Sequence, residues 1–77
     1  MRLPSLQIGE TANVVAVHGG DAVAKRLMEM GVVPGVPVRV VKSAPFGDPI
    51  EIRVRGYSLA VRIREAEAVE VEGPSGK

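Results

Sequence analysis

The stretch IEIRVRGYSLAV, residues 50–61, alternates apolar and polar side chains in two runs that meet at an Arg-Gly pair. Alternation with a period of two is typical of β-strands that bury one face. A two-residue loop at Arg55 and Gly56 would place the apolar residues of one run opposite those of the other. The stretch therefore predicts a β-hairpin with a single apolar face. The expected pairs are Val54 with Tyr57, Ile52 with Leu59 and Ile50 with Val61.

The other face of this hairpin, with nearby turn tips, carries arginines that must meet solvent or a partner. Arg53 and Arg62 are the strongest candidates for a patch that binds an acidic partner surface. The alternative is a solvated exterior on which the arginines pair with Glu51 or Glu65 across strands, and such exposed pairs contribute about 0 to 1 kcal/mol each. The arginines concerned are Arg39, Arg53, Arg55, Arg62 and Arg64.

A short helix is predicted over residues 22–30, because Asp21 can cap its first turn and Gly31 can end it in a left-handed conformation. A helix of this length is stable in water only if it buries an apolar stripe. Leu27 and Met30 are therefore expected in the core. Met28 lies at the edge of the stripe and could instead face a partner, since methionine adapts to varied surfaces.

Three further strands complete the expected sheet. One covers residues 11–17, which are rich in β-branched side chains, and another follows a proline-glycine turn with valine at every second position. The last carries Val69 and Val71 inward after a short helical turn over residues 65–68. Five short strands with one helix after the first strand predict a mainly β fold, a small SH3-like antiparallel β-barrel.

Pro37 and Asp48, the residue before Pro49, each allow a further prediction. Pro37 indicates an edge or the start of a strand because it cannot donate a ladder hydrogen bond, and an unpaired edge there could pair with another copy of the chain. Asp48 precedes Pro49 and is expected to fix a turn through its own backbone. No base or nucleophile accompanies Asp48 at a recognisable spacing, so no enzyme is predicted.

Composition bounds the function further. The 77 residues are 45% apolar and carry a net charge of +1, which is far from the basic balance of proteins that bind phosphate backbones. There is no cysteine, so disulfides and thiolate metal sites are excluded. No apolar run approaches the roughly 20 residues of a membrane span. The sequence predicts one domain over residues 1–72 with a flexible tail over 73–77, soluble and intracellular, without direct membrane insertion and without nucleic acid.

His18 is the single histidine, and Asp21 lies close to it in the sequence. A transition-metal site usually gathers at least three protein ligands, and no further ligand is indicated. An ordinarily solvated loop histidine is expected, with no metal and no cofactor.

Four stretches in this order resemble the FeoA family, small cytosolic proteins of bacterial ferrous-iron transport: LQIGETANVVAVHGG, KRLMEMGVVPGVPVRVV, APFGDPIEIRVRGYSLAVR and EAEAVEVE. The resemblance runs from about residue 3 to residue 72. It implies an SH3-like barrel that works with FeoB, a membrane transporter with a cytoplasmic G-protein domain, and it implies no enzymatic activity. The same fold forms the C-terminal domain of metal-dependent repressors that resemble the diphtheria toxin repressor. No helix-turn-helix precedes it here, so a free-standing FeoA-like protein is expected.

The resemblance also implies a place and a partner-facing region. The protein is expected in the cytoplasm, peripheral at the inner membrane through FeoB, with the helix and the following loop over residues 25–34 facing the partner. Two alternatives stay open. Small SH3-like barrels that bind nucleic acid share the proline-glycine turn, the valine strand and the Gly-Asp loop, and a stand-alone metal-sensing domain could use His18 with carboxylates. The residues expected to bind the partner are Lys25, Arg26, Leu27, Met28, Arg53 and Arg62.

Overall fold

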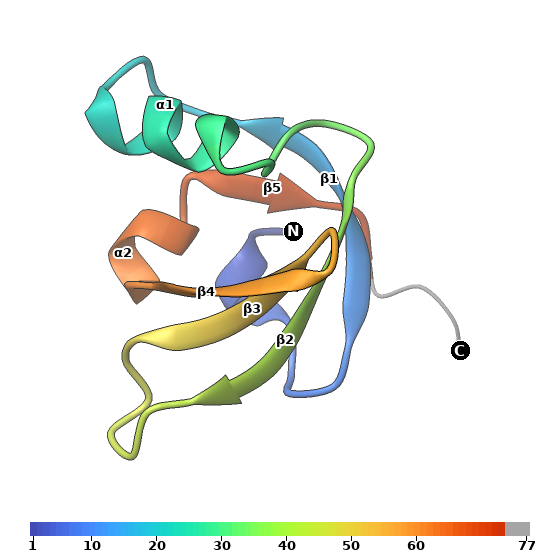
Figure 1. Ribbon diagram of the computed structural model, residues 1–77, viewed down its shortest axis with the longest axis vertical. Helices are drawn as coiled ribbons and strands as arrows, with labels where there is room; N and C mark the ends of the chain where they lie inside the picture. Colours follow the sequence, from blue (N-terminus) through green and yellow to red (C-terminus); the bar gives the residue numbers. More distant parts are fainter. Residues whose placement is uncertain (74–77) are drawn as a thin grey trace.

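A computed structural model of the chain describes residues 1–73, which form one antiparallel sheet of five strands in the order β4-β3-β2-β1-β5 (Figure 1). The prediction of a mainly β fold with a short helix after the first strand is confirmed. The strands are β1 (Thr11–Val17), β2 (Pro37–Ser43), β3 (Ile50–Val54), β4 (Tyr57–Val61) and β5 (Val69–Val71); the helices are the 3-10 turn η1 (Leu3–Ser5), α1 (Ala22–Glu29) and α2 (Ile63–Ala66).

Strand β1 bends the sheet into a barrel because its two halves have different neighbours. Its first half pairs with β2 and its second half with β5. A register shift between Val14 and Ala16 lies within the half that pairs with β5, and Val15, the residue between them, is 43% exposed. A bulge of this kind sharpens the local twist of a strand, which helps a small sheet to close around its core.

The hairpin formed by β3 and β4 has the predicted register. All three expected pairs are present, from Val54 opposite Tyr57 to Ile50 opposite Val61. Its loop residues Arg55 and Gly56 have φ angles of +53° and +91°. A two-residue turn with positive φ at both positions matches the right-handed twist of the strands that it joins. Arginine is strained there, because its Cβ disfavours the left-handed region.

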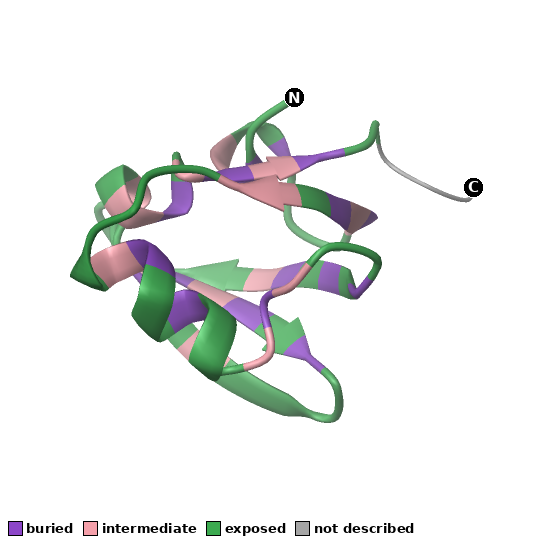
Figure 2. Cartoon of the chain, turned by 90° about the horizontal axis from the view of Figure 1, so that it is seen from above, coloured by how far each residue is buried: buried purple, intermediate pink, exposed green. Residues whose placement is uncertain are grey.

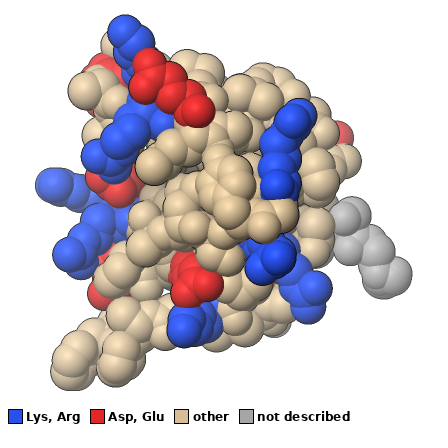
Figure 3. Space-filling model, in the orientation of Figure 1, with Lys and Arg blue, Asp and Glu red and all other residues tan. Residues whose placement is uncertain are grey.

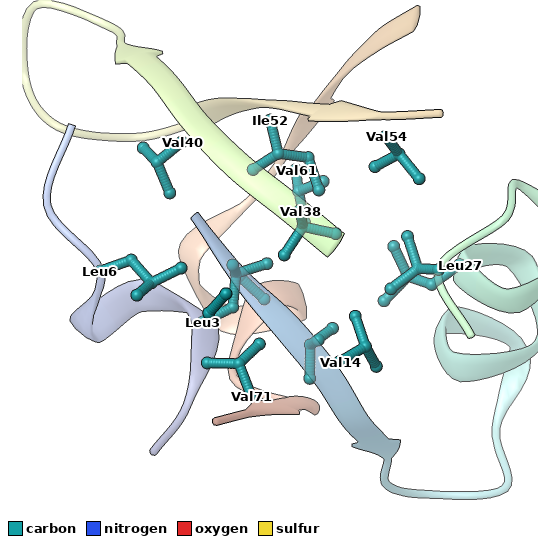
Figure 4. Packing of buried hydrophobic residues seen from close by; sticks show 14 of the residues in the cluster. Leu3, Leu6, Val14, Leu27, Val38, Val40, Ile52, Val54, Val61 and Val71 are labelled. Atoms are coloured by element: carbon teal, nitrogen blue, oxygen red, sulfur yellow. The ribbon is translucent and has the colours of Figure 1, made fainter. Parts of the chain in front are cut away.

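Burial follows the strand alternation, with the inward positions buried and the outward positions exposed (Figure 2). No polar or charged side chain is buried among residues 1–73, and in the view of Figure 3 charged side chains stand out from the surface. Side chains from the β-strands, η1 and α1 point toward one another in the centre (Figure 4), and Ala66 of α2 belongs to the same cluster. The cluster is wholly aliphatic. Its members are Leu3, Leu6, Ala12, Val14, Leu27, Val32, Val36, Val38, Val40, Ile50, Ile52, Val54, Val61, Ala66, Val69 and Val71.

Helix α1 begins as predicted, since the Asp21 carboxylate accepts a hydrogen bond from the Ala24 N–H at 3.1 Å. Its end is built around Gly31, whose φ of +101° lies in the left-handed region. The N–H of Gly31 donates to the Met28 carbonyl and that of Val32 to the Leu27 carbonyl, both at 3.0 Å. These two bonds form a Schellman motif, which satisfies carbonyls that the helix end leaves without a partner.

The prediction that Met30 belongs to the core is wrong, because its side chain is 41% exposed. The helix ends at Glu29, and at Met30 the backbone has already left helical geometry with ψ near 4°. The helical stripe therefore does not extend to residue 30. Val32, fully buried beyond the left-handed turn, takes the inward place instead.

The prediction of an unpaired edge near Pro37 is also wrong. Strand β2 lies between β1 and β3, and Pro37 is opposite Asn13 of β1. The alternative reading of Pro37 as the start of a strand is correct. A proline is tolerated at the first residue of a strand because its missing N–H costs the ladder at most one bond.

Asp48 acts over a longer range than predicted. Its carboxylate accepts a hydrogen bond at 2.9 Å from the N–H of Ile63, the first residue of α2. That N–H has no partner inside the helix, since the first N–H groups of a helix never do. The helical turn expected over residues 65–68 lies at Ile63–Ala66. Of the tail predicted over residues 73–77, all but Gly73 lies outside the described residues.

Candidate partner-binding surfaces

Helix α1 presents only part of the surface that the sequence suggested. Lys25, Arg26 and Met28 are exposed, and Met28 has 40% of its surface accessible. Leu27 is 2% exposed and belongs to the core cluster, so the expectation that it contacts a partner is wrong. Its position on the inward side of the helix gives the physical reason, because a helix of this length requires its apolar stripe for stability.

Arg26 and Arg62 lie at one junction between α1 and α2, and Glu65 joins them. The Glu65 carboxylate accepts a hydrogen bond from the Arg26 guanidinium at 2.9 Å and another from the Arg62 backbone N–H at 3.1 Å. Basic and acidic side chains stand side by side on this flank of the molecule, at the left of Figure 3. At this junction Glu65 therefore balances the charge of Arg26, whereas its bond to Arg62 involves only the backbone.

The prediction that Arg62 lies on the outward face of the hairpin is wrong. Strand β4 ends at Val61, and Arg62 is the residue that caps α2. The bond between its N–H and Glu65 turns the chain out of the strand. Arg53, in contrast, occupies an exposed, outward position of β3.

Arg39 and Arg53 form a cross-strand pair on the outward face of the sheet, at directly opposite positions of β2 and β3. Both side chains are exposed, and within residues 1–73 neither takes part in an ion pair. Like charges directly opposite on neighbouring strands destabilise a sheet, by up to about 1 kcal/mol. The expected partners of the arginines are engaged elsewhere, since Glu51 pairs with Lys42 at 3.7 Å and Glu65 with Arg26. We call Arg39 and Arg53 the arginine pair.

The His18 side chain forms a 2.7 Å hydrogen bond between its Nε2 and the Glu70 carboxylate. This bond holds the pKa of Glu70 below its ordinary value of 4.5, and the nearby charges of His18, Arg2 and the amino terminus act in the same direction. Within residues 1–73 no group of three or more histidines and carboxylates is placed to hold a metal ion.

Phe46 is a feature that the sequence did not single out. It is 99% exposed at the tip of the loop between β2 and β3. The signal available was its position, since an aromatic residue lies there between Pro45 and a Gly-Asp-Pro turn, where no strand or helix pattern buries it. Large apolar side chains exposed this fully can mark interaction sites when they border an apolar surface.

The geometry defines a small SH3-like antiparallel β-barrel with an aliphatic core. Residues 1–73 match the FeoA domain family, and the chain belongs to that family. It is 42% identical to the FeoA protein of Chlorobium tepidum, with a TM-score of 0.85 and coverage of 92% of this chain and 68% of that one. It is 39% identical to FeoA of Stenotrophomonas maltophilia, a prokaryotic SH3 domain protein solved with zinc, with a TM-score of 0.84 and coverage of 94% and 89%.

A fused relative adds a link to a transporter. The chain is 40% identical over 72 residues to the fusion of Fe(2+) transport protein A with the Fe(2+) transporter FeoB in Porphyromonas gingivalis, and it spans 8% of that protein's length. A manganese-dependent transcriptional repressor at 19% identity and a TM-score of 0.83 shares the fold alone. Across residues 1–73, no helix is long and apolar enough to cross a membrane.

Proposed function

We propose that this chain is an accessory protein of bacterial ferrous-iron uptake that docks on the cytoplasmic part of a FeoB-type transporter and modulates its assembly or activity. The observation that carries the proposal is the fused relative, in which a segment 40% identical to this chain is part of the same polypeptide as FeoB. Two domains that are covalently joined in one organism act at the same place. A separate chain with the same role would reach that place by binding.

In this role the protein works in the cytoplasm, next to the inner membrane through its partner, and catalyses no reaction of its own. The arginine pair is the surface that we assign to the transporter. An uncompensated pair of arginines loses its mutual repulsion when carboxylates of a partner approach, and arginine is enriched at protein interfaces because its planar group forms paired hydrogen bonds with carboxylates. The sequence predicted a surface around Arg53 and Arg62. In the structure the arginine directly opposite Arg53 is Arg39.

Met28 and Lys25 on α1 form a second, competing surface. Methionine suits an adaptable apolar contact, and Lys25 beside it would favour a partner with mixed apolar and acidic character. The two surfaces predict different variants to be sensitive, so one titration series separates them.

The test is an affinity titration of this protein against the full-length cognate transporter in lipid nanodiscs. Arg53→Glu should weaken binding at least tenfold, because a repulsive charge replaces an attractive one. Arg64→Glu is the matched control, since Arg64 is an exposed arginine of α2 that has no ion pair within residues 1–73. Loss of binding only with Met28→Ala would place the interface on the helix. Absence of any binding by the folded wild-type protein would refute the proposed function.

A further inference from the structure

The loop between β2 and β3, residues 44–49, presents Phe46 to solvent with 99% of its surface accessible. In Figure 1 this loop projects at the lower left, away from the body of the sheet, and in the same view of Figure 3 the projecting corner is free of charged side chains at its tip. Leaving an aromatic side chain in water forgoes a large hydrophobic stabilisation. A protruding, uncharged aromatic tip therefore suits insertion into an apolar site.

The loop is anchored at both sides of its tip. The Gly47 N–H donates to the Ala44 carbonyl at 2.7 Å, which closes the turn that carries Phe46. The Asp48 carboxylate accepts the 2.9 Å hydrogen bond from the N–H of Ile63, which fastens the loop to α2. Because the loop is already ordered, its insertion into a binding site has little backbone entropy to lose.

A pocket of about 270 Å³ opens at the base of the same loop. The sheet contributes Lys42, Glu51 and Ala60, which are directly opposite one another on β2, β3 and β4. The loop contributes Pro45 and Pro49. The short side chain of Ala60 leaves room beside the prolines. The pocket is open to solvent on one side, and its volume exceeds the roughly 150 Å³ of an enclosed cavity that binds benzene, so a phenyl ring can enter it.

The aromatic tip and the pocket lie on one loop, so a single two-fold axis can place each tip at the pocket of the other copy. In such an interface the same patch serves on both sides, which requires a surface that complements itself. The rim meets this requirement, because it carries the Lys42–Glu51 ion pair and so offers both signs of charge. The net charge of +1 adds little repulsion between copies.

We propose that this chain self-associates as a two-fold dimer in which Phe46 of each copy occupies the pocket lined by Ala60 and the loop prolines of the other. Two phenylalanines bury about 300 to 500 Å² together, whereas a stable specific interface needs at least about 1,000 Å². The remaining contact must come from the loop and the adjoining strand β4. The dimer is accordingly weak and forms at high protein concentration. The proposal needs no transporter, so it stands or falls separately from the docking on FeoB.

The experiment is sedimentation velocity of the whole chain over a range of concentrations. The wild type should shift toward a dimer as concentration rises. Phe46→Ala should raise the dissociation constant at least tenfold, because the dimer loses the same anchor twice. Ala60→Leu should do the same by filling the pocket from an exposed position. Ile8→Ala is the control, since Ile8 is 62% exposed and does not line the pocket.

A mixing experiment distinguishes this geometry from general stickiness. Phe46→Ala retains its pocket and Ala60→Leu retains its aromatic tip, so an equimolar mixture can form one of the two contacts. The mixture should therefore associate more strongly than either variant alone. A wild type that stays monomeric at every concentration would overturn the proposal. So would equal association of Phe46→Ala and wild type, or a mixture no stronger than its components. If Phe46→Ala instead weakened binding to FeoB while the wild type stayed monomeric, the loop would belong to the transporter interface.

Discussion

Replacing Gly31 by alanine tests the junction between α1 and the hairpin tip. The φ of +101° at Gly31 is a conformation that alanine adopts with strain, and an added Cβ would lie 3.2 Å from the Tyr57 hydroxyl oxygen. The left-handed conformation costs an L-residue about 1 to 2 kcal/mol. The close contact adds little, because the Tyr57 hydroxyl is the far end of a side chain that is 44% exposed and can move. We therefore expect Gly31→Ala to lower the free energy of unfolding by about 1 to 2 kcal/mol.

The assay is chemical denaturation followed by circular dichroism, together with thermal melting. A loss of 1 kcal/mol lowers the Tm of a domain of this size by about 4 to 8 °C. Gly20→Ala is the control, because Gly20 has no positive φ and nothing within 4 Å of an added Cβ. It should leave stability within about 0.5 kcal/mol of the wild type or raise it slightly.

A double-mutant cycle with Tyr57→Phe separates the two causes, since that change removes the hydroxyl and keeps the ring. If backbone strain dominates, the Gly31→Ala cost is the same in both backgrounds within about 0.5 kcal/mol. A cost that disappears in the Tyr57→Phe background would refute the reasoning, because it would assign the loss to the contact. A Gly31→Ala variant as stable as the wild type would refute the left-handed helix end itself.

Two further substitutions test the turn and the ion pair that the structure defines. Arg55→Asn should raise the free energy of unfolding by about 0.5 to 1 kcal/mol, because asparagine tolerates the positive φ of the hairpin turn better than arginine does; an unchanged denaturation midpoint would contradict the turn geometry. Because the pKa of Glu70 is lowered in the folded state, the stability from its bond to His18 is present above the ordinary pKa of a glutamate and is lost as the pH falls through the lowered value. Urea denaturation at pH 6 and at pH 3 should therefore show a larger loss for the wild type than for Glu70→Gln, and equal losses would contradict the role of this bond.

The hairpin register and the ends of α1 could be predicted because each rests on a local signal. Period-two alternation admits a single register once the Arg-Gly loop is fixed, since a slip of one residue would expose every apolar side chain. Asp21 and Gly31 are residues whose chemistry acts within one helical turn of their positions. Sequence patterns that act over only a few residues predict the local structure correctly, because the rest of the barrel does not change it.

The failures at Met30 and Arg62 concern the exact ends of helices, and the others concern residues whose roles depend on distant parts of the chain. The Asp48 carboxylate accepts a hydrogen bond from the N–H of Ile63, which is 15 residues away. No local sequence pattern predicts that contact. Arg62 caps a helix without a serine, threonine, aspartate or asparagine at that position, so the usual signature of a helix start was missing. The arginine pair depends on strand order, because Arg39 meets Arg53 only when β2 lies beside β3. The candidate surfaces therefore required the structure, whereas the strands did not.

The two aromatic residues of this chain lie outside its hydrophobic core. The chain has one tyrosine and one phenylalanine, and the described core is complete without either of them. Aromatic side chains usually supply much of the energy of a small core, but here valine, leucine and isoleucine fill it, and Phe46 stands fully exposed. Removing an exposed side chain that packs against nothing changes stability by no more than about 0.5 kcal/mol. Phe46→Ala is for that reason a clean probe of binding, because any loss of association by this variant reflects the interface and not the fold.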